Sequence, residues 1–495
     1  MLFFPTADED FQYFRSQGYT GSINDMHYKA LGDLGYTGSL NDRIHKYLTE
    51  EYGSFYEAMR DLRNGTLTFS LSSLSAYAVN NFDPSLVFDF KQNYYRTGGT
   101  DSTLSGSVTQ TRASSATMTN SSGTLITVGN NVPRTDHHIY NGSAWVNEGI
   151  LHESEARTNI LTYSSMESTG WTFQSGSRSA TTWVLTGASD ATTITASTST
   201  GGNGNRIYKT GIAGGTGVTC SISFYYKANT TVPFLHIRSN NGSGGPGVGA
   251  CINTATGALT TGKTGGTNST SAFATQNVED VGSGWRRFTS TFPTFNTTQS
   301  WILHLSDSSA TTAAGFAGTE TIDVAGCQYE IGSTPSSYIP TSGSTVTRAA
   351  ETLTVPAANL PYSSTNMSIQ MDGRMTGENL TPIRWLEDAN NAILLETGTN
   401  NFTFTQEASG TVDTVTGGSF TSGTFVAFNT SSRHGSIFIN GAISGTALTA
   451  NTTPTALPDL SATDLDLGYD FMGTIGEFRV WSDDLTDTGI EEAST

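Results

Sequence analysis

The chain has 495 residues, which is more than one compact domain usually holds, so we expect about three domains. Only 14% of the residues are charged, whereas glycine is abundant at 54 residues and aromatic residues make up 10%. The aromatic content excludes a wholly disordered chain, and the composition is typical of β-rich proteins with polar, uncharged surfaces. The formal net charge of −19 argues against nucleic acid and anionic membrane surfaces as partners.

The charge is distributed unevenly along the chain. Residues 155–348 hold 10 basic and 9 acidic residues, whereas residues 349–495 hold 4 basic and 18 acidic residues, a shift that marks a domain boundary. Three widely spaced cysteines predict buried thiols in a reducing compartment rather than a disulfide framework or a zinc site. No apolar run is long enough to span a bilayer, and the acidic opening segment lacks a basic start, so we expect neither membrane insertion nor a signal peptide.

Residues 1–66 predict a small helical domain. A repeat that begins GYTGS occurs at Gly18 and again at Gly35, and each copy continues through a capping-box spacing into a helix-period apolar pattern. We expect four short helices here, each too short to be stable alone. Such a unit needs neighbours, which favours docking onto a partner protein. The alternative is a self-contained helical cap.

Helix patterns almost disappear after residue 66. Residues 67–155 predict a β-rich connector. Residues 156–348 contain about eight short alternating runs separated by Gly, Asn and Ser, which is the pattern of a jelly roll. Residues 349–495 repeat this pattern and end in a short helix near 483–494. The predicted fold class is therefore mainly β: two β-sandwich (jelly-roll) domains preceded by a small helical N-terminal domain.

Several stretches resemble proteins of tailed bacteriophages. Residues 111–161, with an Arg-Ala-Ser start, a Pro-Arg-x-Asp centre and an Arg-Thr-Asn end, resemble a virion segment that leads into a carbohydrate-binding-module-like jelly roll. Residues 324–351 resemble the closing pattern of that jelly roll. The pair IFINGAISG (437–445) and GTIGEFRVWSDDLTDTGIEE (473–492) is similar to the concanavalin A-like, or laminin-G-like, superfamily. The GYTGS repeat also resembles the N-terminal unit of some phage structural proteins.

The resemblance implies a phage tail fibre, spike or head appendage that is assembled in the host cytoplasm and becomes part of the virion. Residues 1–66 are then the virion-anchoring domain, which contacts other tail or capsid proteins, and the β-sandwiches meet host-surface glycans. Phage fibres of this kind are commonly trimeric, so the resemblance implies a homo-oligomer and favours a homotrimer. The sequence itself contains no heptad run that fixes this number. Trp481 falls where the laminin-like pattern has an aromatic core residue.

The candidate glycan-binding residues lie on predicted strands within 156–348. If Ile222, Phe224 and Tyr226 face the core, strand alternation turns the intervening side chains outward. Aromatic and basic side chains then share an outer face: Tyr225, Lys227, Phe234, His236, Arg238 and His304. Aromatic faces combined with charged groups recognise sugars. The alternative is an interface with another chain or a neighbouring domain.

Acidic side chains near the C-terminus raise the question of calcium. Asp464 and Asp466 are two residues apart and Asp470 follows closely, so an oxygen-rich loop is conceivable. The spacing is unspecific, and a solvated acidic strand edge is the alternative. We therefore predict no metal site and no cofactor.

Catalytic patterns are weak in this sequence. The nine acidic residues of 155–348 are scattered, and Glu279 and Asp280 point opposite ways if they lie on a strand. His137 and His138 are more typical of a loop or packing feature than of catalysis, and no nucleophile-elbow, zinc-protease or nucleotide motif occurs. We expect a structural and adhesive protein rather than an enzyme. A glycan-degrading spike and a purely structural adaptor or decoration protein remain the alternatives.

Overall fold

The computed structural model describes most of the chain after residue 74. The described ranges are 75–200, 204–228, 230–240, 247–261, 271–294, 297–312, 315–375, 380–398, 401–419, 426–450, 452–454 and 456–495. The expected helical domain of residues 1–66 lies outside these ranges. The chain divides into two compact units, Met1–Pro84 and Ser85–Thr495. Within the first, Asp83 accepts hydrogen bonds from the backbone and hydroxyl of Ser75.

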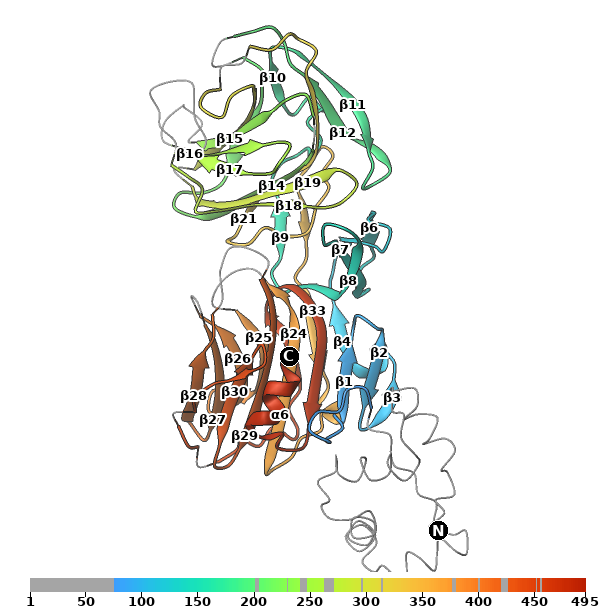
Figure 1. Ribbon diagram of the computed structural model, residues 1–495, viewed down its shortest axis with the longest axis vertical. Coiled ribbons are helices and arrows are strands. Elements are labelled where there is room, and N and C mark those ends of the chain that lie inside the picture. Colours follow the sequence, from blue (N-terminus) through green and yellow to red (C-terminus); the bar gives the residue numbers. More distant parts are fainter. Residues whose placement is uncertain are drawn as a thin grey trace, which may run out of the picture. The chain divides into compact units, whose positions relative to one another are not determined.

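The second unit contains two β-sandwiches and only short helices, which confirms the predicted mainly β fold class (Figure 1). We call one of them the C-terminal sandwich, because most of its strands follow residue 351. Its larger sheet has the strand order β3 (Thr100–Ser102), β2 (Tyr94–Thr97), β1 (Leu86–Asp89), β33 (Met472–Trp481), β24 (Asn366–Met375), β29 (Val426–Gly435), β30 (Ile439–Ile443) and β31 (Thr446–Ala447). Its second sheet has the order β28 (Thr411–Gly417), β27 (Phe402–Ala408), β26 (Asn391–Thr397), β25 (Thr381–Asp388), β32 (Leu465–Asp470), β23 (Thr352–Val355) and β4 (Thr109–Thr111).

The first strands of the unit complete the C-terminal sandwich. In the pairing of β1 with β33, Phe88 lies opposite Phe478, and in the pairing of β4 with β23, Gln110 lies opposite Leu353. Part of the expected connector, residues 86–111, therefore belongs to the C-terminal sandwich, and the jelly roll is inserted between β4 and β23. The sequence of a short strand does not indicate which distant strand it pairs with. Alternation alone therefore could not assign residues 86–111 to the C-terminal sandwich.

The C-terminal sandwich buries aromatic and aliphatic side chains between its sheets. Phe88, Trp385 and Phe478 are fully buried in this cluster. Trp481 is also fully buried, as expected, but it lies beside Arg479 and outside the cluster between the sheets. The helix α6 (Thr486–Ala493) covers β29 and β30 near the C-terminus, where a closing helix was expected. The other helical segments are single turns, α5 (Leu104–Ser107) and the 3₁₀ turn η1 (Ala357–Asn359).

The jelly roll of residues 156–348 is a sandwich of two six-stranded antiparallel sheets. One sheet, which we call the basic sheet, has the order β10 (Thr172–Gln174), β13 (Arg206–Ala213), β20 (Thr298–Ser306), β15 (Phe234–Asn240), β16 (Gly247–Asn253) and β17 (Leu259–Thr261). The other, which we call the junction sheet, has the order β11 (Ser177–Trp183), β12 (Ala188–Thr195), β21 (Thr321–Ile331), β14 (Thr219–Lys227), β19 (Trp285–Pro293) and β18 (Thr275–Asp280). Ile222, Phe224 and Tyr226 are fully buried between the sheets, as predicted.

One pair of short strands and two hairpins lie between the sandwiches in the chain. The strand β9 (Arg157–Asn159), where the chain enters the jelly roll, pairs with β22 (Val346–Arg348), where it leaves. The strands β5 (Ala116–Thr119) and β6 (Leu125–Val128) form one hairpin, and β7 (Arg134–Tyr140) and β8 (Trp145–Glu153) form another. The far end of β8 pairs with β33, so the second hairpin extends the larger sheet of the C-terminal sandwich.

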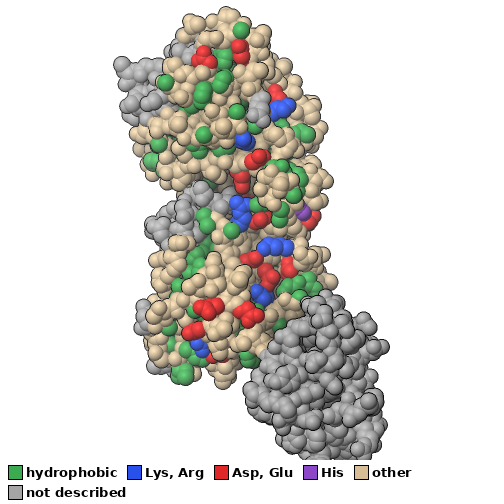
Figure 2. Space-filling view, in the orientation of Figure 1, with side chains coloured by type: hydrophobic (Ala, Val, Ile, Leu, Met, Phe, Trp, Pro, Cys, Tyr) green, Lys and Arg blue, Asp and Glu red, His purple; other side chains and the backbone are tan. Residues whose placement is uncertain are grey.

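The surface and the cysteines agree with the composition. Most of the surface visible in Figure 2 is neither charged nor hydrophobic. The thiols of Cys220, Cys251 and Cys327 are free and buried, as expected. Within the described ranges, no helix combines the length and apolarity needed to cross a bilayer.

Candidate functional site

The six predicted glycan-binding residues lie on both sheets of the jelly roll. Phe234, His236 and Arg238 lie on β15 and His304 on β20, and all four face outward from the basic sheet. Tyr225 and Lys227 lie on β14 of the junction sheet. The two groups therefore point away from each other, on opposite outer faces of the sandwich. The predicted single face does not form, because the chain crosses from one sheet to the other between β14 and β15.

The outer face of the basic sheet combines arginines with aromatic rings. Arg206 and Tyr208 on β13 join Phe234 and Arg238 there, and all four side chains are half-buried. In the register, Tyr208 and Arg238 flank Ile302 from its two sides, and Arg206 lies opposite His304. The guanidinium carbon of Arg206 is 4.9 Å from the centre of the Tyr208 ring, and its Nε donates to Gln174 Oε1 at 2.9 Å. Sequence reasoning missed Arg206 and Tyr208, although the outward Arg-x-Tyr spacing beside the inward Ile207 could have revealed them.

Two buried histidines lie between these arginines and rings. His236 and His304 are direct cross-strand neighbours and are only 1% and 4% exposed. His236 Nε2 donates to the carbonyl of Ser308 at 2.9 Å and lies 3.6 Å from Cys251 Sγ. Burial, together with Arg206, His236 and Arg238, lowers the pKa of His304 to about 3, so this imidazole is neutral at physiological pH.

The basic sheet carries no acidic residue. Its six strands contain Arg206, Lys209 and Arg238 but no Asp or Glu, in a chain that has 43 acidic residues. Burial and the nearby charge of Arg206 lower the pKa of Arg238, which indicates that the two cations are close enough to repel each other. An anion on this face would relieve that repulsion.

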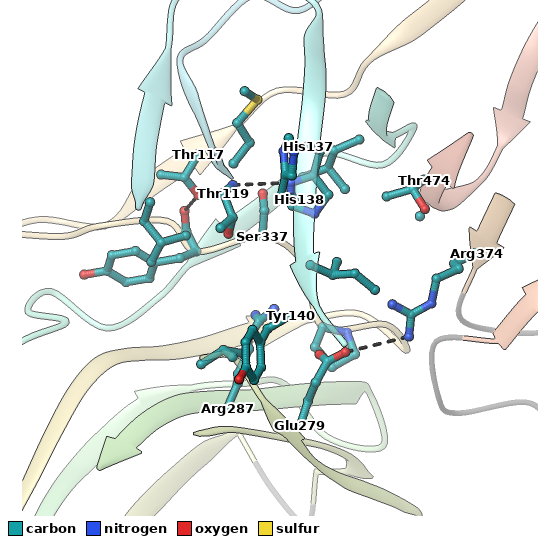
Figure 3. Close-up of a pocket in the computed structure, with 18 of the residues that line it drawn as sticks. Thr117, Thr119, His137, His138, Tyr140, Glu279, Arg287, Ser337, Arg374 and Thr474 are labelled. Carbon is teal, nitrogen blue, oxygen red and sulfur yellow. Dashed lines mark hydrogen bonds and ion pairs between the residues drawn. The ribbon is translucent and has the colours of Figure 1, made fainter. Parts of the chain in front are cut away.

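A pocket lies on the other side of the jelly roll, where the junction sheet meets the β5–β8 hairpins and the C-terminal sandwich (Figure 3). Its cavity volume is about 100 Å³ and it opens to solvent. The predicted residue Tyr225 lines it but is only 4% exposed, whereas Lys227 lies outside it with a half-exposed side chain 3.7 Å from Asp323. The aromatic wall of the pocket includes Tyr140 and Trp145, whose ring centres are 5.3 Å apart.

His137 and His138 lie on strand β7 rather than in a loop, and both line the pocket. The backbone N–H of Thr119 donates to His137 Nδ1 at 3.3 Å, and burial with the charge of Arg134 lowers the pKa of His137 to about 3. His138 Nδ1 is 2.9 Å from the carbonyl of Asp136, two residues earlier. Both imidazoles are thus tied into the packing of their own hairpin.

Glu279 and Asp280 both line the pocket, but their partners differ. Glu279 Oε1 lies 3.7 Å from Arg374 Nη2 of the C-terminal sandwich, as Figure 3 shows. Asp280 accepts a hydrogen bond from the backbone N–H of Gly282 at 2.9 Å and so fixes the turn into β19.

Residues from the sequence motifs of 111–161 and 324–351 come together beneath the pocket as a buried ionic cluster. Arg134 Nη2 lies 2.7 Å from Glu153 Oε2 and 2.6 Å from Glu351 Oε2, and Arg112 Nη1 lies 2.5 Å from Glu351 Oε1. Arg348 Nε reaches Glu153 at 3.1 Å, and none of these side chains is more than 4% exposed. Burial alone would raise the pKa of Glu153 and of Glu351, but the arginine charges outweigh it and hold both values below the ordinary range. We call these five residues the arginine–glutamate cluster. The arginines and glutamates of this cluster therefore stabilise the fold, and their charges are paired with one another rather than with a ligand.

Two of the three acidic residues considered for calcium form contacts with the protein. Asp466 Oδ2 lies 2.5 Å from Arg384 Nη2, and Asp464 Oδ1 accepts from the backbone N–H of Ala357 at 2.8 Å. Burial raises the pKa of Asp470, and the charge of Glu155 adds to this effect. Among the described residues, no group of three or more His, Cys, Asp or Glu side chains is arranged to hold a metal ion.

Comparisons with known proteins find similarity only at the level of solved structures. No family model and no curated protein matches the chain. Similar structures include the carbohydrate-binding module CBM40 of the Ruminococcus gnavus IT-sialidase bound to α2,3-sialyllactose, at 14% identity and a TM-score of 0.24, covering 27% of this chain and 84% of that one. Domain 4 of the extracellular arabinanase AbnA from Geobacillus stearothermophilus, in complex with arabinotriose, has 16% identity and a TM-score of 0.24, covering 30% and 73%. Domains LG4-5 of the mouse laminin α1 chain have 9% identity and a TM-score of 0.20, covering 64% and 94%. These neighbours are carbohydrate-binding and laminin-G-like β-sandwich domains, and the fold assignment above rests on strand pairing rather than on them.

Proposed function

We propose that this protein is a structural component of a phage virion, a tail fibre, spike or head appendage, that holds host-surface glycans on the outer face of the basic sheet. One observation carries the adhesive part of the proposal: a six-stranded sheet without acidic residues presents Arg206, Arg238, Tyr208 and Phe234 together on its outer face. Residues 1–66 anchor the chain to other virion proteins. The anchoring and the phage origin rest on the sequence resemblance alone.

The chemistry of this face suits an acidic glycan. Sugar rings stack their C–H faces on aromatic rings such as Tyr208 and Phe234, and guanidinium groups such as those of Arg206 and Arg238 pair with carboxylates or phosphates. Because the sheet lacks carboxylates of its own, it does not repel an anionic chain as most of this acidic protein would. Acidic polysaccharides of the cell surface are therefore the preferred ligands in this proposal.

Binding without cleavage is the mode that the basic sheet supports best. Glycoside hydrolysis generally needs two carboxylates about 5–9 Å apart, and the described strands of this sheet contribute none. A homo-oligomer, with a trimer favoured by the resemblance, would present several copies of the face and convert weak single contacts into durable attachment.

Immobilised bacterial surface polysaccharides test the adhesive proposal directly. We expect the full chain to bind acidic polysaccharides more tightly than neutral ones, with an affinity that falls as salt rises. The double variant Arg206→Gln, Arg238→Gln should lose at least about tenfold in affinity, because each guanidinium supplies a charge-assisted contact. Unchanged binding by a folded double variant would refute the assignment of the site. Release of reducing sugar from the polysaccharide would instead favour the glycan-degrading alternative.

Labelling of intact particles tests the virion proposal. Antibodies against residues 349–495 should mark a free outer tip, and antibodies against residues 1–66 should reach their target only after the particle is dissociated. The opposite pattern, or a basic sheet covered by another virion protein, would favour the adaptor alternative.

A further inference from the structure

Arg287 is a buried cation for which the described part of the chain supplies no carboxylate partner. It lies on β19, is only 9% exposed, and lines the pocket between the junction sheet and the β5–β8 hairpins. Its Nη2 donates to the carbonyl of Ser336 at 2.5 Å and to Ser223 Oγ at 3.2 Å, both uncharged acceptors. Its Nε is buried and has no acceptor, and no carboxylate of a described residue lies within 4 Å of the guanidinium.

This arrangement differs from that of every other buried arginine nearby. Arg112, Arg134 and Arg348 each form an ion pair with Glu153 or Glu351 within the arginine–glutamate cluster, whereas Arg287 forms none with a described residue. A buried charge without a counter-ion is costly unless something else compensates it. The open side of Arg287 faces the pocket, where an anion can enter from solvent.

The nearest candidate counter-ion is already held elsewhere. Glu279 lies directly opposite Arg287 in the β18–β19 register, so the two side chains share one side of the sheet. Its carboxylate turns instead toward Arg374 of the C-terminal sandwich, at 3.7 Å. The guanidinium of Arg287 is therefore available to pair with an anionic ligand. The carboxylate of Glu279 is still close enough to repel that ligand.

The rest of the pocket presents the surfaces that a sugar ring needs. Tyr140 and Trp145 form an aromatic wall, and Trp145 is held in place by close contact with Gly123 and Gly282, where a Cβ atom would lie within 2.4 Å of the indole. The guanidinium of Arg287 also lies 5.5 Å from the centre of the Tyr225 ring, which fixes its orientation. The cavity volume is about 100 Å³, and one water needs about 10–15 Å³ by the same measure. The cavity therefore holds a single terminal sugar rather than an internal stretch of a glycan chain.

We propose that this pocket is a second binding site, separate from the basic sheet, which takes the terminal acidic monosaccharide of a glycan with its carboxylate against Arg287 and its ring against Tyr140 and Trp145. The aromatic wall favours a sugar acid over an acidic peptide side chain, since a pyranose offers a flat C–H face and a peptide carboxylate does not. The assignment holds whether or not the basic sheet binds glycans, because the two sites lie on opposite faces of the jelly roll.

The test uses the full chain and free monosaccharides, D-glucuronate as the acidic probe and D-glucose as its neutral match. It is run in the Arg206→Gln, Arg238→Gln background, so that binding to the basic sheet cannot be mistaken for binding to the pocket. We expect glucuronate to bind with a dissociation constant near 1 mM, measured by saturation-transfer NMR, and glucose to bind at least about tenfold more weakly. Equal binding of both sugars, or tighter binding of N-acetyl-aspartate than of glucuronate, would overturn the proposal.

Two substitutions with a matched control locate the site. Arg287→Gln should weaken glucuronate binding at least about tenfold. Arg286→Gln should leave it unchanged, because that neighbouring arginine points to the other side of the strand and donates to the carbonyls of Thr254 and Ala255. If Arg287→Gln fails to fold, Glu279→Gln decides the matter. Removal of that half-buried negative charge should strengthen glucuronate binding several-fold at low salt, whereas unchanged or weaker binding would refute the assignment.

Discussion

The two outer faces of the jelly roll are both formed by alternating strands, but one face is buried within the protein and the other is accessible to solvent. On the junction sheet, Tyr225 packs against Trp183 with ring centres 4.9 Å apart, Trp183 packs against Tyr338 at 5.4 Å, and all three are buried. On the basic sheet, the aromatic residues Tyr208 and Phe234 remain half-buried. One outer face has become a second core, and the other has kept side chains that a ligand can reach.

Segments outside the strands produce this difference. Arg287 on the junction sheet donates to the carbonyl of Ser336, and Thr117 of the β5–β6 hairpin donates to the carbonyl of Tyr338 at 2.6 Å. The chain after β21 therefore lies across the junction sheet and is itself held by the hairpins. The lesson is that an outward-facing aromatic residue predicts a contact, and that only the course of the connecting segments decides whether the contact lies inside the chain or outside it.

The strongest test of this comparison is to remove one aromatic residue from each face. Trp183→Ala should lower the free energy of unfolding by about 3–5 kcal/mol, because it leaves a cavity beneath Tyr225 and Tyr338. The matched substitution on the basic sheet, Tyr208→Ala, should cost less than about 1 kcal/mol. Urea unfolding of both full-length variants measures the difference. Similar losses for the two would show that the faces are equally internal.

The next effect comes from the arginine–glutamate cluster that joins the covered face to the C-terminal sandwich. Glu351→Gln keeps the shape of the side chain but leaves Arg112 and Arg134 with one fewer negative charge. Loss of one partner from a buried ion pair costs about 3 kcal/mol or more. The ion pair between Arg433 and the exposed Asp487 supplies the control, since Asp487→Asn should cost less than about 1 kcal/mol. If Glu351→Gln lowers the free energy of unfolding no more than Asp487→Asn does, the arginine–glutamate cluster does not stabilise the fold.

Acid should weaken the covered face in two steps. The folded protein holds the pKa of His137 at about 3, whereas an unfolded histidine takes up a proton near pH 6.5, so stability begins to fall as the pH drops below about 6.5. The folded protein also holds the pKa values of Glu153 and Glu351 low, whereas unfolded glutamates take up protons near pH 4.3. Stability from these two is complete above that pH and falls further as the pH drops through it.

Urea midpoints measured from pH 7.5 to pH 3.5 check this behaviour. Each group contributes at most about 1.4 kcal/mol per pH unit, and the other buried histidines with lowered pKa values, His152, His304 and His434, add to the first step. Glu351→Gln should flatten the second step and leave the first unchanged. A midpoint that stays constant down to pH 4 would show that these charges do not stabilise the fold.

The sequence predicted the inward faces of strands, but it predicted about eight strands in residues 156–348, where the two sheets of the jelly roll contain twelve. The inward positions Ile222, Phe224 and Tyr226 follow from alternation alone. Alternation is a local property, fixed by the two-residue period of a strand, and it needs no knowledge of the partner. It does not say to which sheet a strand belongs, which is why Tyr225 and Arg238 were placed together although they lie on opposite faces.

The arginine–glutamate cluster could not have been predicted from the residues for a similar reason. Arg112 and Glu351 are separated by 239 positions in the chain, and they meet because β4 pairs with β23, which places Thr111 opposite Thr352. The resemblance marked both stretches, yet it offered no role for their arginines. Arg287 was likewise invisible as a candidate, because an uncompensated charge is recognised only when all of its neighbours are known.

The smallest expected effect is that of a substitution at Lys227, and it compares one cation on each face in the same binding assay. Lys227 was grouped with Arg238 by its outward position, but it lies on the junction sheet with a half-exposed side chain 3.7 Å from Asp323. Lys227→Gln should therefore change the free energy of unfolding by less than about 0.5 kcal/mol and change polysaccharide binding by less than about twofold. Arg238→Gln removes the same formal charge from the basic sheet and should weaken binding several-fold in the same assay. Equal losses would mean that overall charge, rather than one face, attracts the glycan, because a long-range field does not distinguish two cations on the same small domain.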